Sequence, residues 1–368
     1  MIAQKSPFSI PEPYQKFDQP TEEGQLKGEE LLSQGKVACL VLAGGQGTRL
    51  GTSLPKALVE ITPIRKKTLL QLLCEKTAAA SRAYKTSLQI AIMTSCSNHE
   101  QIADYLCQNN YFGLKVDQVH LFTQDEAPFV TEDGNWIEEA GSYATGPNGN
   151  GHSLKKLIES NIGKQWKEQG IESLIVLPID NPLADPFDAA LCGQHALNNQ
   201  DVTIKAIQRS DPAEKVGVIV LRDGKVSVQE YSELPDYFEA PLAHIGLFCF
   251  SLSFVERIAE IELPWHLARK IYRGHPIWKF EHFLFDVLAF SDQTGVLVYP
   301  RENVYAPLKN FEGPHSVETV QLALSAFDKR LVADLTKMPE PSHLFELDPA
   351  FYYIRLDRKT MWIGKTVA

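Results

Sequence analysis

The chain has 368 residues, of which 44% are hydrophobic and 22% charged, and its formal net charge at pH 7 is -10. This composition is typical of a folded globular protein that is long enough for one large domain or two unequal ones. The acidic balance argues against a surface built to bind nucleic acid, because such surfaces need clustered Lys and Arg. Any phosphate-binding site must therefore be local.

The cysteines and the hydrophobic runs indicate the cellular compartment of the protein. Six cysteines are scattered along the chain without a C-x-x-C pair or a Cys/His cluster, which predicts buried free thiols in a reducing compartment. The N-terminal sequence MIAQKSPFSIPEP lacks the features of a signal peptide, and no apolar run approaches the ~20 residues of a membrane span. We expect a cytoplasmic protein that binds no membrane.

The first half of the chain alternates between predicted helices and strands. Residues 1–36 are polar and contain several prolines, and their second half predicts a helix that leads into a buried strand at Val37 to Leu42. Thr68 is predicted to cap a helix that begins immediately after it. Further predicted strands are 88–94, 118–122, 174–179 and 202–207, and further predicted helices are 98–108, 153–169 and 187–197. This alternation predicts an α/β, Rossmann-like fold with a central mixed, mostly parallel sheet.

Past Arg209 the pattern changes. Residues 216–234, VGVIVLRDGKVSVQEYSEL, are two alternating apolar runs joined at Asp223-Gly224, which predicts an inserted β-hairpin that forms one wall of a cleft. Further predicted strands are 245–250 and 296–299, and further predicted helices are 254–259, 281–290 and 317–331. The aromatic-bearing tail that follows predicts a small C-terminal lobe or a packed appendage.

The stretch VACLVLAGGQGTRLGTSLPK, residues 37–56, carries the strongest chemical signal. Its glycines at 44, 45, 47 and 51 lack Cβ, so the backbone can turn sharply and point several N–H groups at one anion. Arg49 adds a planar cationic fork and Lys56 a point charge, as a polyphosphate requires. The pattern predicts a phosphate cradle.

Other glycine-rich loops fit this stretch less well. A Walker loop has the pattern G-x-x-x-x-G-K-[ST], whereas Lys56 follows Pro55 and has no Ser or Thr after it. A dinucleotide fingerprint has the pattern G-x-G-x-x-G, and the second gap between Gly45, Gly47 and Gly51 is one residue too long. A purely structural turn would explain the glycines but would leave Arg49 and Lys56 without a role.

Polar residues that follow later strands are weaker candidates. Gln124 offers an amide donor and acceptor to a base edge, although an exposed loop residue is the simpler interpretation. The tight loop at 146–151 could approach a ring or sugar, or be only a turn. Asp180 follows the strand LIVLPI and could bind Mg²⁺ or cap the next turn. Glu230 could accept hydrogen bonds from sugar hydroxyls, and Lys309 could meet a phosphate.

Several stretches match one family in the same order along the chain. They are LAGGQGTRLG at 42–51 with Pro55-Lys56, MTS at 93–95, NNYFGL at 109–114, GNG at 149–151, Asp180-Asn181, VGV at 216–218, EYSE at 230–233, FEHFLFDVL at 280–288 and PLKN at 307–310. With these stretches the sequence resembles the eukaryotic-type UDP-N-acetylglucosamine pyrophosphorylases, within the wider family of UTP:hexose-1-phosphate uridylyltransferases. The resemblance covers roughly residues 37–312.

The resemblance implies an activity and a role for each matching residue. The activity is the joining of UTP and N-acetylglucosamine-1-phosphate into UDP-N-acetylglucosamine and pyrophosphate, with Mg²⁺ as cofactor. Residues implied to hold the triphosphate are Gly44, Gly45, Gly47, Thr48, Arg49 and Lys56. Gln124 and Gly149 are implied to contact uracil, Asn150 the nucleotide sugar, Asp180 Mg²⁺, Gly217 and Glu230 the hexose, and Lys309 the sugar phosphate. The implied division is an N-terminal helical arm at 1–36, a nucleotidyltransferase domain at 37–312 and a small C-terminal lobe at 313–368.

Two departures from the family pattern keep alternatives open. Our alignment places Leu247, within HIGLFCF, where the N-acetylglucosamine enzymes carry an Asn that contacts the sugar. The family's larger C-terminal region is expected to be reduced here, and we expect a monomer or a weak homo-oligomer. A UDP-glucose or broad UDP-sugar pyrophosphorylase is the alternative enzyme, and a catalytically inactive nucleotide-sugar sensor is a third possibility. A dehydrogenase is disfavoured by the loop spacing.

Overall fold

The computed structural model describes residues 12–52, 54–139, 141–211, 214, 216–230, 234, 238 and 240–367. One mixed ten-stranded sheet forms its centre, and seven of its strands follow the order β1-β12-β14-β10-β2-β3-β4. Of the other three, β11 pairs with β14, β17 pairs with β11, and β13 pairs with β12. Its strands are β1 (Glu12–Pro13), β2 (Val37–Leu42), β3 (Gln89–Thr94), β4 (Val119–Thr123), β10 (Ser173–Pro178), β11 (Val202–Gln208), β12 (Val218–Arg222), β13 (Lys225–Gln229), β14 (Leu242–Ser251) and β17 (Thr294–Val298).

The sheet combines a parallel half with an antiparallel half. Strands β10, β2, β3 and β4 run parallel to one another, as do β11 and β17. Strand β14 is antiparallel to both β10 and β11 and so joins the two parallel groups. The predicted hairpin is present as β12 and β13, which extend the same sheet. The predicted mixed α/β fold is confirmed.

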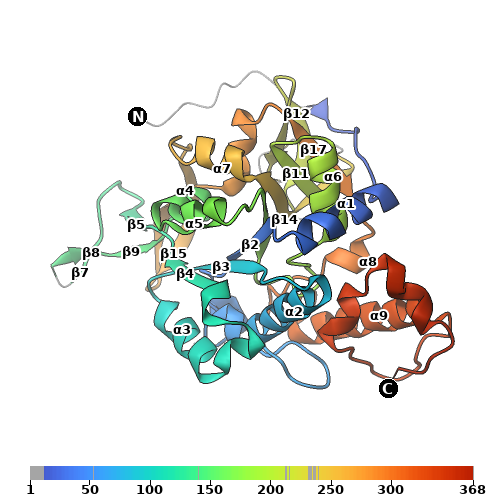
Figure 1. Cartoon of the computed structure of the whole chain (residues 1–368). Coiled ribbons are helices and arrows are strands. Elements are labelled where there is room, and N and C mark those ends of the chain that lie inside the picture. Colours follow the sequence, from blue (N-terminus) through green and yellow to red (C-terminus); the bar gives the residue numbers. More distant parts are fainter. Residues whose placement is uncertain are drawn as a thin grey trace.

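Helices cover both faces of the sheet (Figure 1). The helices are α1 (Glu22–Ser33), α2 (Leu69–Tyr84), α3 (His99–Gln108), α4 (Ser153–Glu159), α5 (Ile162–Glu168), α6 (Ala189–Leu197), α7 (Leu252–Ile258), α8 (Arg301–Val304) and α9 (Val317–Thr336). Alternate residues of β2 enter opposite cores: Val37, Cys39 and Val41 pack with α1, α2 and α6, whereas Ala38 and Leu40 pack with α4, α5 and α7. The two apolar faces explain why β2 lacks the polar alternation of a half-exposed strand.

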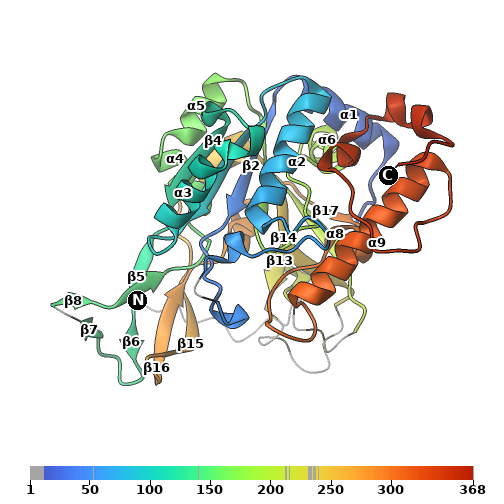
Figure 2. The ribbon, with the colours of Figure 1, turned by 90° about the horizontal axis from the view of Figure 1, so that it is seen from below.

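Short strands form a projection that the sequence did not predict. They are β5 (Glu126–Pro128), β6 (Val130–Thr131), β7 (Glu138–Glu139), β8 (Ser142–Tyr143), β9 (Thr145–Pro147), β15 (His266–Tyr272) and β16 (His275–Glu281). Strands β15, β16 and β6 form a three-stranded sheet, and β5 pairs with β9. Both ribbon views show this projection extending away from the body, on the side opposite α9 (Figure 2).

Two predicted helices differ in the structure. The predicted helix at 153–169 is divided into α4 and α5 because Asn161 adopts a left-handed conformation with φ of 63°. The predicted helix at 281–290 is wrong at its start, since Glu281 ends β16, and residues Leu284–Phe290 form a 3₁₀ helix. Local pattern did not reveal either interruption, because both segments keep apolar residues at helical spacing.

The C-terminal segment packs against the body. Helix α9 is capped by the Ser316 side chain, and the tail beyond it returns across α9 and α2. The Tyr352 hydroxyl donates to Asp328 at 2.8 Å, and the Tyr353 hydroxyl donates to Asp185 at 2.5 Å. Asp185 lies in the segment that follows β10, so this hydrogen bond fixes the tail to that segment. The predicted division into three segments stays a prediction.

Candidate active site

The glycine-rich loop begins where β2 ends, at the carboxyl edge of the parallel strands. The Ala43 amide donates to the Met93 carbonyl at 2.8 Å, so the loop leaves the sheet beside β3. The Lys56 amide donates back to the Gly45 carbonyl at 3.3 Å, which closes the loop upon itself. A Cβ on Gly47 would lie 2.6 Å from the Leu54 carbonyl oxygen, so this close approach requires glycine.

Gln124 lies against the start of this loop. Its backbone amide donates to the Thr94 carbonyl at 2.8 Å, just beyond β4, and the residue is 8% exposed. A Cβ added to Gly44 would lie 2.2 Å from Gln124 Nε2, so the side-chain amide occupies the space that glycine leaves open. The simple interpretation of Gln124 as an exposed loop residue is therefore wrong. The structure brings together the predicted cradle and the predicted base-contacting amide.

Lys56 and Asp180 form an ion pair across the end of the sheet. Lys56 Nζ lies 3.2 Å from Asp180 Oδ2, and both side chains are about four-fifths buried, with 19% and 21% exposed. Asp180 follows β10, which is the parallel neighbour of β2. The pair therefore places the last cation of the cradle beside the carboxylate predicted to bind metal.

The segment that carries Lys309 is also fixed to the end of β10. The Leu308 amide donates to the Asp180 carbonyl at 2.8 Å. Next in the chain, the Asn181 side chain donates to the Val304 carbonyl at 2.7 Å and accepts from the Ala306 amide at 3.0 Å. Asn181 is 3% exposed, so these bonds are shielded from water.

A cavity of about 350 Å³ opens beside these residues. Among the predicted site residues, the structure places Asn150, Asp180, Gly217, Glu230 and Lys309 on its wall. Gly217 precedes β12 and Glu230 follows β13, so the predicted hairpin forms one wall as expected. The other lining residues are Leu42, Pro178, Asn181, Val216, His244, Ile245, Gly246, Phe248, Phe283, Leu284, Phe285, Tyr305 and Pro307.

The second glycine loop, at residues 146–151, is hydrogen-bonded to His282, the residue that follows β16. Gly149 has φ of 88°, and a Cβ there would lie 2.3 Å from the His282 carbonyl oxygen. The Gly151 amide donates to that carbonyl at 2.9 Å, and Asn150 Oδ1 accepts from the Leu284 amide at 3.0 Å. Burial lowers the pKa of His282, so its ring stays neutral where it lies against Trp265 at a centroid distance of 3.6 Å. The loop and its glycines are thus fixed by close contact with a buried histidine.

Eight of the thirteen predicted site residues do not line the cavity, and they are Gly44, Gly45, Gly47, Thr48, Arg49, Lys56, Gln124 and Gly149. Arg49 lies in an exposed position of a 3₁₀ turn at Thr48–Leu50 and is not part of the cavity wall. Thr48 begins that turn. Both belong to the loop of the predicted cradle rather than to the cavity wall.

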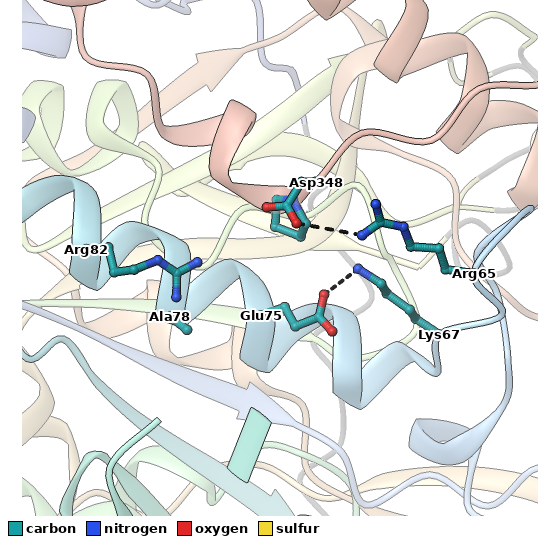
Figure 3. Close-up of a pocket in the computed structure, with 7 residues that line it drawn as sticks. Arg65, Lys67, Glu75, Ala78, Arg82 and Asp348 are labelled. Carbon is teal, nitrogen blue, oxygen red and sulfur yellow. Dashed lines mark hydrogen bonds and ion pairs between the residues drawn. The ribbon is translucent and has the colours of Figure 1, made fainter. Parts of the chain in front are cut away.

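A second hollow lies apart from this site, between α2, the turn before it and the tail (Figure 3). It measures about 210 Å³, and its wall contains Arg65, Lys67, Glu75, Ala78, Arg82, Asp348 and Pro349. Lys67 is 5% exposed and pairs with Glu75. Because cations and carboxylates alternate around it, and because it contains no predicted site residue, we assign it no role in the chemistry.

Sequence patterns did not identify the aromatic part of the cavity. Phe248, Phe283, Phe285 and Tyr305 line it together with His244. FEHFLFDVL includes two of these rings and was noted only as a matching stretch. The others lie in segments with no distinctive motif, and only the fold brings them to one place.

Comparisons with known proteins agree with this geometry. A family model described as UTP-glucose-1-phosphate uridylyltransferase matches residues 7–245, more than half of the chain. The chain belongs to this family. The predicted family and the predicted enzyme class, a nucleotidyltransferase of the pyrophosphorylase type, are confirmed.

Individual uridylyltransferase relatives extend the match over most of the chain. A Dictyostelium discoideum protein named "probable UDP-N-acetylglucosamine pyrophosphorylase" is 36% identical over 348 residues, which cover 83% of this chain and 72% of that protein. A solved structure from Entamoeba histolytica, assigned as a UDP-N-acetylglucosamine pyrophosphorylase, is 27% identical and has a TM-score of 0.88, covering 96% of this chain and 98% of that one. The Trypanosoma brucei enzyme of that name, solved with an inhibitor, is 26% identical with a TM-score of 0.82, covering 89% and 75%.

Proposed function

We propose that this uridylyltransferase-family protein joins UTP and N-acetylglucosamine-1-phosphate into UDP-N-acetylglucosamine and pyrophosphate. The observation that carries the proposal is the convergence at the end of β10, where the Asp180 side chain meets Lys56 and its backbone holds the segment of Lys309. Lys56 thus belongs to the cradle and Lys309 to the cavity wall. Two polyanionic substrates that must react with each other need this arrangement, because their mutual repulsion has to be offset.

The reaction needs no nucleophile from the protein. A phosphate oxygen of the sugar phosphate attacks the α-phosphorus of UTP in line, the bond from that phosphorus to the bridging oxygen breaks, and pyrophosphate leaves. Lys56 would stabilise charge on the transferring group, and Lys309 would hold the attacking phosphate. Positioning and charge stabilisation are therefore the whole task of the protein.

The donor set at Asp180 fits a magnesium ion that arrives with the nucleotide. Among the described residues there is no group of three or more His, Cys, Asp or Glu side chains that could hold a metal without help. Mg²⁺ typically keeps several waters and is bound through one or two carboxylates together with substrate phosphates. Asp180 supplies such a carboxylate, and the ion would neutralise phosphate charge when bound. An Asp180→Asn variant should need a higher Mg²⁺ concentration for half-maximal pyrophosphate release, with UTP concentration held fixed.

The cavity wall favours an acetylated sugar over glucose. Three phenyl rings, Phe248, Phe283 and Phe285, line it alongside the polar Glu230 and Asn150. An acetamido methyl would bury apolar area against such rings, whereas a hydroxyl would leave them facing a polar group. The names of the relatives point the same way. UDP-glucose synthesis is the second candidate, because the family model is described by glucose-1-phosphate.

The deciding experiment measures pyrophosphate release from UTP and Mg²⁺ with N-acetylglucosamine-1-phosphate and glucose-1-phosphate in parallel. We expect a higher kcat/KM for the acetylated sugar. A preference for glucose-1-phosphate would move the assignment to the second candidate. No release with either sugar, together with measurable UTP binding, would refute an enzyme and favour a nucleotide-sugar sensor.

The cysteines support the proposed cytoplasmic location. All six are free; Cys39, Cys74, Cys192 and Cys249 are buried as expected, whereas Cys96 and Cys107 are exposed. Exposed free thiols fit a reducing compartment. In the part of the chain that the structure describes, no helix is long and apolar enough to cross a membrane. The proposed monomer or weak homo-oligomer can be checked by light scattering across a concentration series.

A further inference from the structure

Strand β14 passes along the cavity, and its residues divide between the two sides of the sheet. His244, Gly246 and Phe248 lie on the cavity wall. Leu247 is 1% exposed, is opposite Lys205 of β11, and packs in the other core. The expectation that Leu247 occupies a sugar-contacting position is therefore wrong. The position of β14 that presents a polar side chain to the cavity is His244.

The His244 ring has an unsatisfied polar atom in an aromatic setting. Its Nδ1 is buried and has no hydrogen-bond partner among the described residues. Phe248 lies 4.7 Å from the ring, centroid to centroid, and Phe285 lies 6.4 Å away. The His244 backbone, in contrast, is fixed, since its amide donates to the Gly217 carbonyl at 2.9 Å. A buried polar atom without a partner is costly, and the ring that carries it lines the cavity, so a ligand bound there would contact this imidazole.

The protonation state of the ring sets what it can offer. Burial lowers the pKa of His244 to about 4, so the imidazole is neutral at pH 7. A neutral imidazole has one nitrogen that donates and one that accepts. It can therefore pair with a neutral polar group without adding a positive charge to the cavity. Lys309 already supplies a positive charge for the proposed sugar phosphate.

We propose that His244 is a specificity-determining residue, which hydrogen-bonds the acetamido group of the sugar while Phe248, Phe283 and Phe285 contact its methyl. This inference rests on the proposed function and extends it to one residue. An amide offers both an N–H and a carbonyl oxygen, and either matches a neutral imidazole. A sugar hydroxyl could meet the ring as well, but it would leave the phenyl rings without an apolar partner. Because a site built to bond a group rejects analogues that leave its own polar atoms unpaired, His244 should raise discrimination against glucose-1-phosphate.

Two substitutions test the role of the hydrogen bond separately from that of the ring. His244→Phe keeps an aromatic ring but removes both nitrogens, whereas His244→Asn keeps a donor and an acceptor on a shorter side chain. The measured quantity is the ratio of kcat/KM for N-acetylglucosamine-1-phosphate to that for glucose-1-phosphate. We expect His244→Phe to lower this ratio by about 10-fold to 100-fold, mainly through KM of the acetylated sugar, and His244→Asn to retain most of it. KM for UTP should change little in either variant.

A matched control removes a histidine elsewhere in the sheet. His120 of β4 is partly buried, bonds Gln89 and does not line the cavity, so His120→Phe should leave the sugar ratio unchanged. A His244→Phe variant that binds UTP normally and keeps the wild-type ratio would overturn the proposal and make His244 an ordinary core residue.

Titration calorimetry with the products separates this inference from the proposed function. We expect wild-type protein to bind UDP-N-acetylglucosamine more tightly than UDP-glucose, and His244→Phe to lose that difference. If the wild-type protein releases no pyrophosphate with any sugar phosphate but still shows this binding difference, the catalytic proposal fails and the assignment of His244 stands. Equal binding of the two products by the wild-type protein would refute the assignment of His244.

Discussion

Gly44→Ala is the smallest change that separates the cradle from the predicted base contact. The added Cβ would lie 2.2 Å from Gln124 Nε2, whereas ordinary contact needs about 3.5 Å. The nearest atom is the end of a flexible side chain, so we expect the Gln124 amide to move by about 1 Å and the fold to remain intact. A hydrogen bond of ordinary length that is stretched by that amount is lost.

The expected cost follows from that single contact. The net value of one such hydrogen bond is about 1 kcal/mol, which corresponds to roughly a five-fold increase in the dissociation constant of UTP. The proposed site of the sugar phosphate is the cavity wall at Lys309 rather than the Gly44 loop, so the KM of the sugar phosphate should change little. The assay is titration calorimetry with UTP, combined with thermal unfolding to show that stability is retained.

A double-mutant cycle tests the assumed cause. In a Gln124→Ala background the methyl group introduced at position 44 has no amide to displace, so Gly44→Ala should then weaken UTP binding much less than it does in the wild-type chain. The coupling energy should be close to the whole effect of the single change. Equal losses in both backgrounds would refute this reasoning and show that the methyl group blocks the nucleotide directly.

Three further predictions follow from single residues. Lys56→Ala should lower kcat by roughly 100-fold to 1000-fold with a smaller change in UTP binding, and unchanged turnover would exclude Lys56 from the chemistry. Burial lowers the pKa of His195 to about 4, below the unfolded value near 6.5, so stability is lost as pH falls from about 6.5 towards 4, by about 2 kcal/mol at pH 5. The free energy of unfolding, measured in urea, should therefore differ by about 2 kcal/mol less between pH 7.5 and pH 5 in His195→Gln than in the wild-type protein. An unchanged pH dependence of the unfolding free energy would contradict this assignment. Gly193→Ala would place a Cβ 1.8 Å from the Gly24 carbonyl oxygen and force α1 and α6 apart, so the unfolding free energy should fall by about 3 kcal/mol; an unchanged melting temperature would disprove the contact.

The elements around the cradle could be predicted because their local signals agree. Strand β2 has the predicted bounds, Val37–Leu42, since a continuous apolar run before a glycine pair is typical of a strand with two buried faces. Thr68 caps α2 as predicted, with its side chain accepting from the Gln71 amide. In both cases the residues that decide the structure are neighbours in the sequence.

The projection could not be predicted from the sequence for the opposite reason. Strand β15, HLARKIY, is mostly exposed, so its residues show no strong alternation between apolar and polar types. It exists because it pairs with β16, and β16 in turn pairs with β6, more than a hundred residues earlier in the chain. Pairing between distant segments leaves little trace in local pattern.

The position of His244 shows the same limit within the site. The residues HIGLFCF read as a buried strand, and local spacing cannot say which of them faces the cavity. The register between β11 and β14 shifts by two residues, since Lys205 lies opposite Leu247 and Ala206 opposite His244. A shift of two residues keeps the faces, so His244, Gly246 and Phe248 share the cavity side while Leu247 packs in the other core. Which of the two sets faces the cavity is decided by the neighbouring strands and not by the local sequence.

The end of β10 explains how cations from distant parts of the chain are placed together. The Asp180 carboxylate holds Lys56, and its carbonyl holds the Leu308 amide beside Lys309. Asn181 then fixes the preceding turn through two bonds of its own. Two consecutive residues at one strand end thus hold Lys56 by a partly buried ion pair and the backbone beside Lys309 by buried hydrogen bonds. Fixed charges of this kind lower the barrier more than mobile ones, since they need not reorganise during the reaction.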